Sequence, residues 1–493
     1  MFNWLHKSFH GKLNPYVLGI TLFFLLIICF ILLVPPQIGV ADSGDYGRIL
    51  AVFDLYYIPD YTNFKHFYDT FIFGRPDSAP TYGGYLATTS LFIFLALFTN
   101  KIFTAFADTN TLFYLYSLSS VYIVFYLAAF FFLQNIIFEK VPHKIIATII
   151  GIGSALILTD SLFIEYFNSF FQEAGFIVSL LLFVSIFLRY QIFLLDVALL
   201  ALVIFSKEQN ILFFLLIIPI IIKYKGKFNL KKTLIIVAFM TVPMYIFNYI
   251  NTYAKGINNF DSVYNGLFQD VAQETAATEL PKLGLNPQYA IFSSRDYWGT
   301  VGELRSSQDT NKYMLWQQAI NDSSHLITLH GYLLNPTKLL NNSFKYLQIL
   351  QKDGPFAPNL GNYKPQYEDS FRVSAFTIFA HFVKYTGFVI VLNLVLLCLI
   401  VFLMQKKHYL EKGNDKWLRS CVSLLCMLNA VVLSTIPVNI IGGGFEEPVK
   451  HFFCAYYTIG IIFILSILTI FNLRGTAKKS SKTQQQNMLF SVK

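Results

Sequence analysis

Charged and amide side chains gather in four short clusters, and each cluster borders a long apolar run of the sequence. A carboxylate at a membrane–water boundary can accept a proton from a hydroxyl or amine. A nearby cation can bind a phosphate and stabilise it as it leaves. Because charges at a membrane edge are costly, this repetition indicates a functional site. The clusters consist of Asp42, Asp45 and Arg48; Asp160, Glu165, Asn168, Gln172 and Glu173; Lys207, Glu208, Gln209 and Asn210; and Glu446, Glu447, Lys450 and His451.

The composition is that of a polytopic membrane protein. Of 493 residues, 55% are hydrophobic and only 13% are charged, which excludes an ordinary soluble globule. We attribute the net charge of +9 to lysines on cytoplasmic loops, so we expect no nucleic-acid partner. The five cysteines lie in or beside apolar segments, which argues against a disulfide framework and against a thiol-based metal site.

The apolar segments predict the membrane spans, since a span needs roughly 20 mostly apolar residues. The first run follows Lys7 and Lys12, and we interpret it as an uncleaved span that starts in the cytoplasm. We therefore predict an all-α polytopic membrane protein with about 10–11 transmembrane helices. The segments lie at about 16–35, 85–106, 112–138, 144–160, 174–190, 191–205, 210–222, 232–250, 381–404, 418–440 and 452–472.

Basic segments then set the orientation. Residues 138–144, 223–232 and 406–419 and the tail from Arg474 are rich in Lys and Arg and should be cytoplasmic. An odd number of crossings must then separate the first outer loop from residue 138. Because the apolar part of 85–106 is only about 14 residues long, we expect it to lie along or dip into the outer face. This gives about ten spans with both termini inside; eleven spans, with 85–106 crossing, is the alternative.

This topology divides the chain into four parts and puts all four polar clusters on the outer side. Residues 1–250 form an N-terminal transmembrane module with a first outer loop at 38–111. A large extracytoplasmic loop at 251–380 has the varied composition of a folded, helical unit. Residues 381–473 form C-terminal transmembrane helices, and 474–493 a disordered cytoplasmic tail.

Each cluster also has a purely structural interpretation. The alternatives are helix capping for Asp42 and Asp45, a favourable position at a helix start for Glu173 and His451, and a local ion pair for Lys207 with Glu208. The convergence of all four clusters on one side favours function. The sequence contains no GxGxxG and no GxxxxGK[ST] motif, so a nucleotide-binding domain is not indicated.

The layout resembles the type C integral-membrane glycosyltransferases. In that superfamily an acidic outer loop with membrane-parallel helices follows the first span, a second acidic loop and a Lys-containing turn come later, and a large outer loop follows the seventh span. Here "ADSGDYGR", the segment 85–106, "EYFNSFFQEAG", "FSKEQN" and the loop 251–380 take those places. "VKHFF" and "LGLNPQYAIFSSRDYW" look like bacterial members that build surface glycans. The two acids of the first loop are separated by Ser43 and Gly44, whereas the common pattern has them adjacent.

The resemblance implies transfer of a sugar from a polyprenyl-phosphate donor to a glycan, lipid or protein acceptor, at the outer face of a bacterial inner membrane. Membrane lipid would surround the enzyme. Asp42, nearest the span end, is the favoured base, ahead of Asp45. No cofactor is indicated beyond the lipid-linked donor; a divalent cation could bridge carboxylates and phosphate, but no dedicated metal site is visible. The predicted site comprises Asp42, Asp45 and Glu173 as catalytic residues, Lys207, Lys450, His451 and Arg48 as phosphate contacts, and Glu165, Asn168 and Gln209 as acceptor or sugar contacts.

Two other functions are compatible with this layout. A flippase or transporter for a lipid-linked glycan would be expected to show inverted repeats and charges at mid-membrane, and neither is visible in the sequence. An O-antigen-type polymerase or ligase shares the large outer loop. It would be expected to place paired arginines there, for which Arg295 and Arg305 are the nearest candidates.

Overall fold

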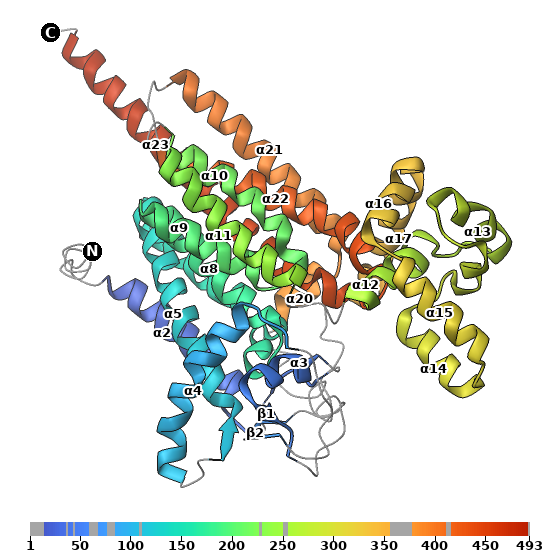
Figure 1. The fold of residues 1–493 in the computed structure, drawn as a ribbon. Coiled ribbons are helices and arrows are strands. Elements are labelled where there is room, and N and C mark those ends of the chain that lie inside the picture. Colours follow the sequence, from blue (N-terminus) through green and yellow to red (C-terminus); the bar gives the residue numbers. More distant parts are fainter. Residues whose placement is uncertain are drawn as a thin grey trace.

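The computed structural model is a helical bundle with a helical unit at one side (Figure 1). It describes residues 14–35, 38–42, 45–58, 68–75, 84–107, 111–225, 229–249, 255–354, 377–410 and 416–491. Apart from one small sheet, the regular structure of these residues is helical. The prediction of an all-α polytopic membrane protein is therefore confirmed.

Seven helices of the described residues are long and apolar enough to cross a membrane. A bent pair, α6 with the segment from Ser161 to Asn168, adds an eighth if it counts as one span; its two parts meet at 49°. The seven helices are α2 (Pro15–Leu32), α4 (Thr88–Ala107), α5 (Leu115–Lys140), α8 (Gln172–Arg189), α21 (Thr386–Leu410), α22 (Lys416–Gly443) and α23 (Pro448–Ser491).

The described residues hold seven or eight such helices, against ten or eleven predicted spans, and part of the difference is that two predicted spans are short. The segment 191–205 is the 13-residue helix α9 (Phe193–Phe205), which rises only about 20 Å. The segment 210–222 is a 3-10 helix, η3 (Glu208–Leu216), followed by the short α10 (Ile217–Lys223). The polar residues between α9 and η3 interrupt what would otherwise be a longer apolar helix.

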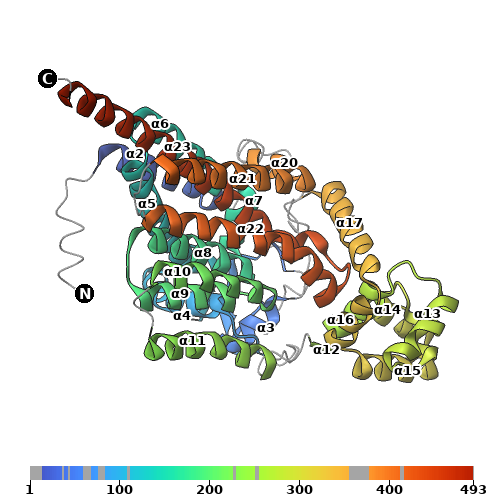
Figure 2. The same cartoon turned by 90° about the horizontal axis from the view of Figure 1, so that it is seen from above.

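Helix α8 is the centre of the bundle, and 89% of its apolar window is buried, against 22% for α21 at the edge. It packs between α5 and α9, while α22 and α23 cover the same core from the other side (Figure 2). Helix α11 (Leu230–Tyr249) lies against α9. Any side chain in the first turn of α8 is therefore placed inside the assembly.

Helix α4 lies against only one end of α5. Phe92 packs on Tyr122, and the Thr99 hydroxyl donates to the Ser117 carbonyl at 3.1 Å, near the start of α5. The Asn100 amide donates to the Leu112 carbonyl at 2.9 Å. These contacts fit a helix beside the polar end of the bundle. That residues 85–106 do not cross the membrane stays a prediction.

The first loop contains a small antiparallel sheet, which the sequence did not predict, whereas the segment 85–106, predicted to be a membrane-parallel element, is helical as part of α4. Strand β2 (Thr70–Phe73) pairs with β1 (Leu55–Tyr56) and with β3 (Leu112–Tyr114), in the register Leu55↔Phe73 and Phe71↔Phe113. Besides α4, the loop holds the five-residue helix α3 (Tyr46–Leu50). Aromatic residues favour such strands because they pack on the pleated surface.

The large loop is a folded helical unit, as its composition indicated. It stands beside the bundle and meets it at α22 and α23 (Figures 1 and 2). Its elements are α12 (Lys255–Asp261), the π-helix η4 (Ser262–Leu267), α13 (Gln273–Glu279), η5 (Leu280–Leu283), η6 (Pro287–Phe292), α14 (Tyr297–Ser307), α15 (Thr310–Asp322), α16 (His325–Leu334) and α17 (Pro336–Asp353).

Helix α23 continues through residues 474–491, where composition predicted a disordered tail. Lys and Gln recur in this stretch and favour helix, so the backbone can continue the preceding turns. The remaining described helices are the 3-10 helix η1 (Ala51–Phe53), α6 (Lys144–Leu158), α7 (Ser161–Ile164) with the 3-10 helix η2 (Glu165–Asn168), and α20 (Ile378–Val383).

Candidate functional site

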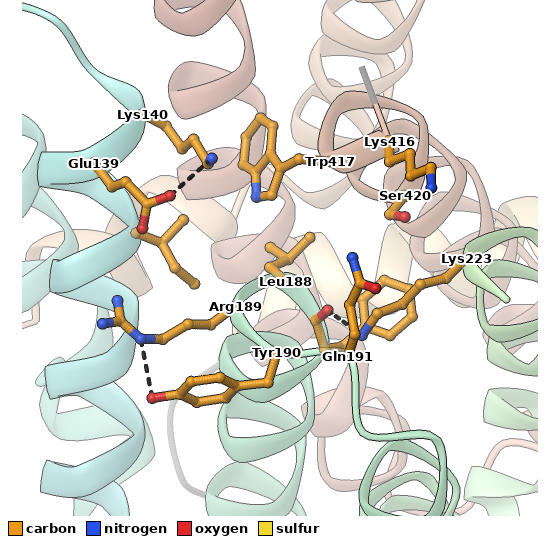
Figure 3. Close-up of a pocket in the computed structure, with 12 residues that line it drawn as sticks. Glu139, Lys140, Leu188, Arg189, Tyr190, Gln191, Lys223, Lys416, Trp417 and Ser420 are labelled. Carbon is orange, nitrogen blue, oxygen red and sulfur yellow. Dashed lines mark hydrogen bonds and ion pairs between the residues drawn. The ribbon is translucent and has the colours of Figure 1, made fainter. Parts of the chain in front are cut away.

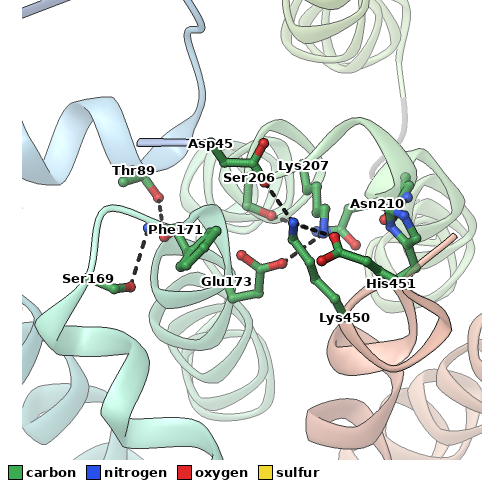
Figure 4. Close-up of polar contacts among 12 residues, drawn as sticks. Asp45, Thr89, Ser169, Phe171, Glu173, Ser206, Lys207, Asn210, Lys450 and His451 are labelled. Carbon is green, nitrogen blue, oxygen red and sulfur yellow. Dashed lines mark hydrogen bonds and ion pairs between the residues drawn. The ribbon is translucent and has the colours of Figure 1, made fainter. Parts of the chain in front are cut away.

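The first and last polar clusters meet at Lys450, in the first turn of α23. Its ammonium group donates to Asp45 Oδ2 at 2.8 Å and to Glu447 Oε2 at 2.7 Å (Figure 4). It also lies 5.5 Å from the centre of the Phe171 ring, within cation–π range. The other oxygen of Asp45 accepts from Arg48. One carboxylate is therefore held between two cations from opposite ends of the chain.

The second and third clusters meet in a buried ion pair. Glu173, in the first turn of α8, accepts from Lys207 Nζ at 2.7 Å (Figure 4). Lys207 has extended backbone between α9 and η3. This break is fixed by Asn210, whose backbone N–H donates to the Lys207 carbonyl at 2.9 Å and whose amide donates to Ser206 Oγ at 2.8 Å. The interruption of the apolar run thus aims a cation at the central helix.

The third and fourth clusters are also joined directly. Gln209 Nε2 lies 2.5 Å from His451 Nδ1, which connects η3 to α23 one residue after Lys450. The neighbouring Glu208 lies outside this contact, and burial raises the pKa of its carboxyl group, although Lys255 and Arg48 oppose that shift. The site thus has contributions from all four predicted clusters.

Asp42 lies beneath this surface. Its carboxylate is only 2% exposed, and it accepts from the Tyr46 backbone N–H at 3.0 Å and from the Tyr57 hydroxyl at 2.5 Å. Asp45, by contrast, has a side chain that is 23% exposed. Burial raises the pKa of the Tyr46 phenol, and the Asp42 charge raises it further. Asp42 fixes the start of α3, while Asp45 faces the cations.

Asn168 fixes the first loop to the bundle. Its amide donates to the Leu32 carbonyl at 3.1 Å and to the Ile38 carbonyl at 2.7 Å, and its oxygen accepts from Ser119. The buried side chain is thus committed to contacts within the protein. The structure gives Asn168 a positioning role, where the sequence predicted a sugar or acceptor contact. Glu165 is likewise buried, in η2.

Asp160, from the same segment, is a second internal anchor. It caps α7 by accepting from the Leu162 N–H at 3.1 Å. Its other oxygen accepts from the N–H groups of Phe379 and Ala380, at 2.8 and 3.0 Å. The carboxylate therefore joins the N-terminal module to the start of the C-terminal helices.

The turn that presents Lys450 is held by the large loop. Gly444 has φ +66°, and a Cβ there would lie 2.6 Å from the Asp261 carbonyl oxygen, so only glycine fits. The Tyr346 hydroxyl of α17 donates to the Pro448 carbonyl at 3.0 Å. Glu447 itself has φ +39°, which is unusual for a residue with a side chain. Such strained residues often occur at functional sites.

Two polar atoms at the site are buried and have no hydrogen-bond partner among the described residues: Glu173 Oε2 and Gln209 Oε1. Most buried polar atoms in proteins are paired, so each of these acceptors is suited to a donor from a ligand. The described residues contain no group of three His, Cys, Asp or Glu side chains able to hold a metal ion.

The structure brings together seven of the ten residues that the sequence proposed for the site. They are Asp45, Arg48, Glu173, Lys207, Gln209, Lys450 and His451. Asp42 lies just below them, and Glu165 and Asn168 lie in the supporting core. Their roles toward a substrate stay predictions.

Three aromatic residues at the site were missed. Tyr57 bonds Asp42, Phe171 lies under Lys450, and Tyr85 lies 5.8 Å from the Arg48 guanidinium. With 52 Phe and 30 Tyr in the chain, residue type alone could not distinguish them. A usable signal was position, since Phe171 directly precedes the Gln172–Glu173 pair.

The fold and this charged site define an all-α, polytopic integral membrane protein. The chain belongs to the family described as the YfdI N-terminal transmembrane domain, whose model matches residues 2–488. No curated protein and no solved structure gave a significant match.

Proposed function

We propose that this protein is a membrane glycosyltransferase that takes its sugar from a polyprenyl-phosphate donor and passes it to a glycan, lipid or protein acceptor. The site would face the outside of a bacterial inner membrane. The observation that carries the proposal is the buried Glu173–Lys207 pair, whose carboxylate retains one acceptor atom, Oε2, without a partner among the described residues. A substrate hydroxyl can donate to that atom.

The cations suit the phosphate of the donor. Lys207, Lys450 and Arg48 come from three separate segments and are each partly or largely buried. In a partly dry site such cations bind phosphate more strongly than they would in water. Carboxylates now neutralise them, so an arriving phosphate would compete for these contacts.

An apolar groove beside the site suits the lipid chain. Its volume is about 440 Å³, and it lies between α9 and α11. Phe205 lines it and stands two residues before Lys207 in the sequence. A chain lying in the groove would thus bring its phosphate toward the cations. The lining residues are Ala198, Ala201, Leu202, Phe205, Ala238, Phe239 and Val242.

The chemical step follows from these positions. The acceptor hydroxyl oxygen forms a bond to the anomeric carbon, and the bond from that carbon to the phosphate oxygen breaks. The leaving polyprenyl phosphate keeps the electron pair and is stabilised by Lys207 and Lys450. The hydroxyl proton passes to a carboxylate. We favour Asp45 or Glu173 for this proton over Asp42, since Asp42 is buried and already accepts two hydrogen bonds.

The test is sugar transfer by the purified full chain in proteoliposomes, with polyprenyl-phosphate hexoses as donors and release of polyprenyl phosphate as the measurement. We expect Glu173→Gln to lower transfer by about 10²-fold or more. Lys338→Gln is the matched control, because it removes a charge that pairs with Glu279 in the large loop, away from the site. Full transfer by Glu173→Gln at normal expression would contradict the proposal.

The polymerase or ligase alternative gains no support from the large loop. Arg295 is in an ion pair with Glu303, which also accepts from Lys312. This arrangement is a partly exposed ion-pair network within the loop.

A further inference from the structure

A polar cavity lies at the end of the bundle opposite the charged site. Its volume is about 190 Å³, and it opens between the ends of α5, α8 and α10 and the start of α22 (Figure 3). Glu173 begins α8 and Arg189 ends it, which separates the cavity from the charged site by about 24 Å. The cavity therefore cannot be part of that site.

The cavity is lined mainly by hydrogen-bond donors and cations. Four basic side chains face one carboxylate, Glu139, which pairs with Lys140 at 2.9 Å. Lys223 pairs with the buried Asp196 at 2.6 Å. Neither Arg189 nor Lys416 forms an ion pair with a carboxylate among the described residues. The basic residues are Lys140, Arg189, Lys223 and Lys416.

An unpaired donor also lines this cavity. Trp417 Nε1 is buried and has no acceptor among the described residues. Lys140 lies 5.3 Å from the centre of the Trp417 ring, and Figure 3 shows the two side chains next to each other above Leu188. A buried N–H group without an acceptor is uncommon, so this one is suited to a ligand oxygen. Ser420 and Gln191 supply further polar groups.

Three basic segments, which the sequence analysis used to set the orientation in the membrane, each contribute a lysine to this cavity. Lys140, Lys223 and Lys416 come from the basic stretches 138–144, 223–232 and 406–419. Lysines and arginines in the last turn of a helix also stabilise its dipole, which is the simplest alternative for Lys140, Arg189 and Lys223. That alternative explains neither Lys416, which begins α22, nor the unpaired Trp417 N–H.

We propose that this cavity binds a phosphate-bearing anion, in the geometry of a phospholipid headgroup held between helices at the basic end of the bundle. Basic pockets between transmembrane helices suit such headgroups. The basic side chains that line the cavity bind the phosphate oxygens, and Trp417 Nε1 donates to one of them. The site is independent of the transferase proposal.

The experiment uses the purified full chain and two probes: nanodiscs with phosphatidylglycerol diluted in phosphatidylcholine, and inorganic phosphate in neutral detergent. Lipid retained by the protein is counted by native mass spectrometry, and phosphate binding by calorimetry. We expect Arg189→Gln combined with Lys416→Gln to weaken binding about tenfold or more. Trp417→Phe, which leaves the net charge unchanged and keeps an aromatic ring, should weaken binding a few-fold.

The matched control is Lys225→Gln combined with Lys231→Gln, which removes the same charge from the same end of the bundle but outside the cavity. Loss in the lipid arm alone identifies a headgroup site, and loss in the phosphate arm alone identifies a site for a free anion. If the cavity variants match the control in both arms, the basic residues only stabilise helix ends and the proposal is wrong. Thermal unfolding of each variant separates lost binding from lost folding.

Discussion

Lys450 and Asp45 form an ion pair at 2.8 Å although they are 405 residues apart in the sequence. The pair closes the charged site by joining the first loop to the start of α23. Glu447, held by the same ammonium group at 2.7 Å, places a second carboxylate beside it. The two residues therefore define both the location of the site and the parts of the chain that must be in place to form it.

Substitutions of the two aspartates of the first loop should have different effects, one on sugar transfer and the other on protein stability. Asp45→Asn keeps the shape but removes the charge between Arg48 and Lys450, so transfer should fall by about 10²-fold. Asp42→Asn should mainly destabilise the protein, by about 1.5–3 kcal/mol, because it weakens buried bonds to Tyr46 and Tyr57. Transfer rates and thermal unfolding of both variants in detergent check this. If Asp42→Asn instead abolished transfer and Asp45→Asn only lowered stability, Asp42 would be the base.

The Glu173–Lys207 pair should show strong coupling. Lys207→Gln alone leaves Glu173 as a buried charge without compensation, at a cost of about 3–5 kcal/mol. The double variant Glu173→Gln with Lys207→Gln removes both charges, so most of the stability should return. Transfer should remain lost. Unfolding and transfer assays on the single and double variants make the comparison, and transfer that returns together with stability would show that the pair is only structural.

Blocking the groove between α9 and α11 should weaken the binding of long-chain donors and leave short-chain donors largely unaffected. Ala238→Trp fills the groove, so the KM for a long-chain polyprenyl donor should rise severalfold, with little effect on a short-chain donor. Val237→Trp is the control, because it places the same side chain on α11 outside the groove. Equal effects of the two variants on both donors would rule out the groove as the lipid site.

The contact between Asp261 and Glu446 should make the large loop sensitive to pH. Burial raises the pKa of Asp261, and the neighbouring Glu446 carboxyl raises it further. A raised carboxyl pKa means that the folded protein holds its proton at pH values where the unfolded chain, with a pKa near about 3.9, has lost it. Stability from this contact is thus complete below about pH 4 and declines as pH rises toward the folded pKa.

Asp261→Asn should flatten that pH dependence, since the amide cannot ionise. Thermal unfolding of the wild type and this variant, measured at pH 5, 7 and 9, provides the test. Asp270→Asn is the control, because Asp270 is an exposed carboxylate of the same loop that pairs with Lys345. A wild-type pH dependence that persists in Asp261→Asn would assign it to other groups.

The sequence predicted the class of fold and most of the polar residues that lie together in the candidate site, because both depend on strong local signals. Long apolar runs specify helices, and charges beside them are rare enough to be noticed, as with Lys207 between α9 and η3. The sheet at β2 was missed, since its short aromatic strands resemble the helical sequence around them. The ten or eleven predicted spans exceed the seven or eight candidates among the described residues partly because an apolar run does not show where a helix breaks.

The different roles of Asp42 and Asp45 could not be predicted from their spacing in the sequence. It depends on tertiary contacts, in which Tyr57 reaches Asp42 and Lys450 reaches Asp45. The contacts of Asn168 could not be predicted either, because its partners, the Leu32 and Ile38 carbonyls, come from a distant segment of the sequence. Residue type indicated polar chemistry, whereas the fold decided which polar groups remained available.

The link between Asp45 and Lys450 also sets an order of events during biosynthesis. Ribosomes make the chain from its N-terminus, so Asp45, Glu173 and Lys207 are inserted long before α23 emerges. The cation that closes the site is delivered only with that late helix. A chain whose synthesis or insertion stops before Pro448 lacks Lys450, so the charged centre is complete only after the start of α23 has been made and inserted.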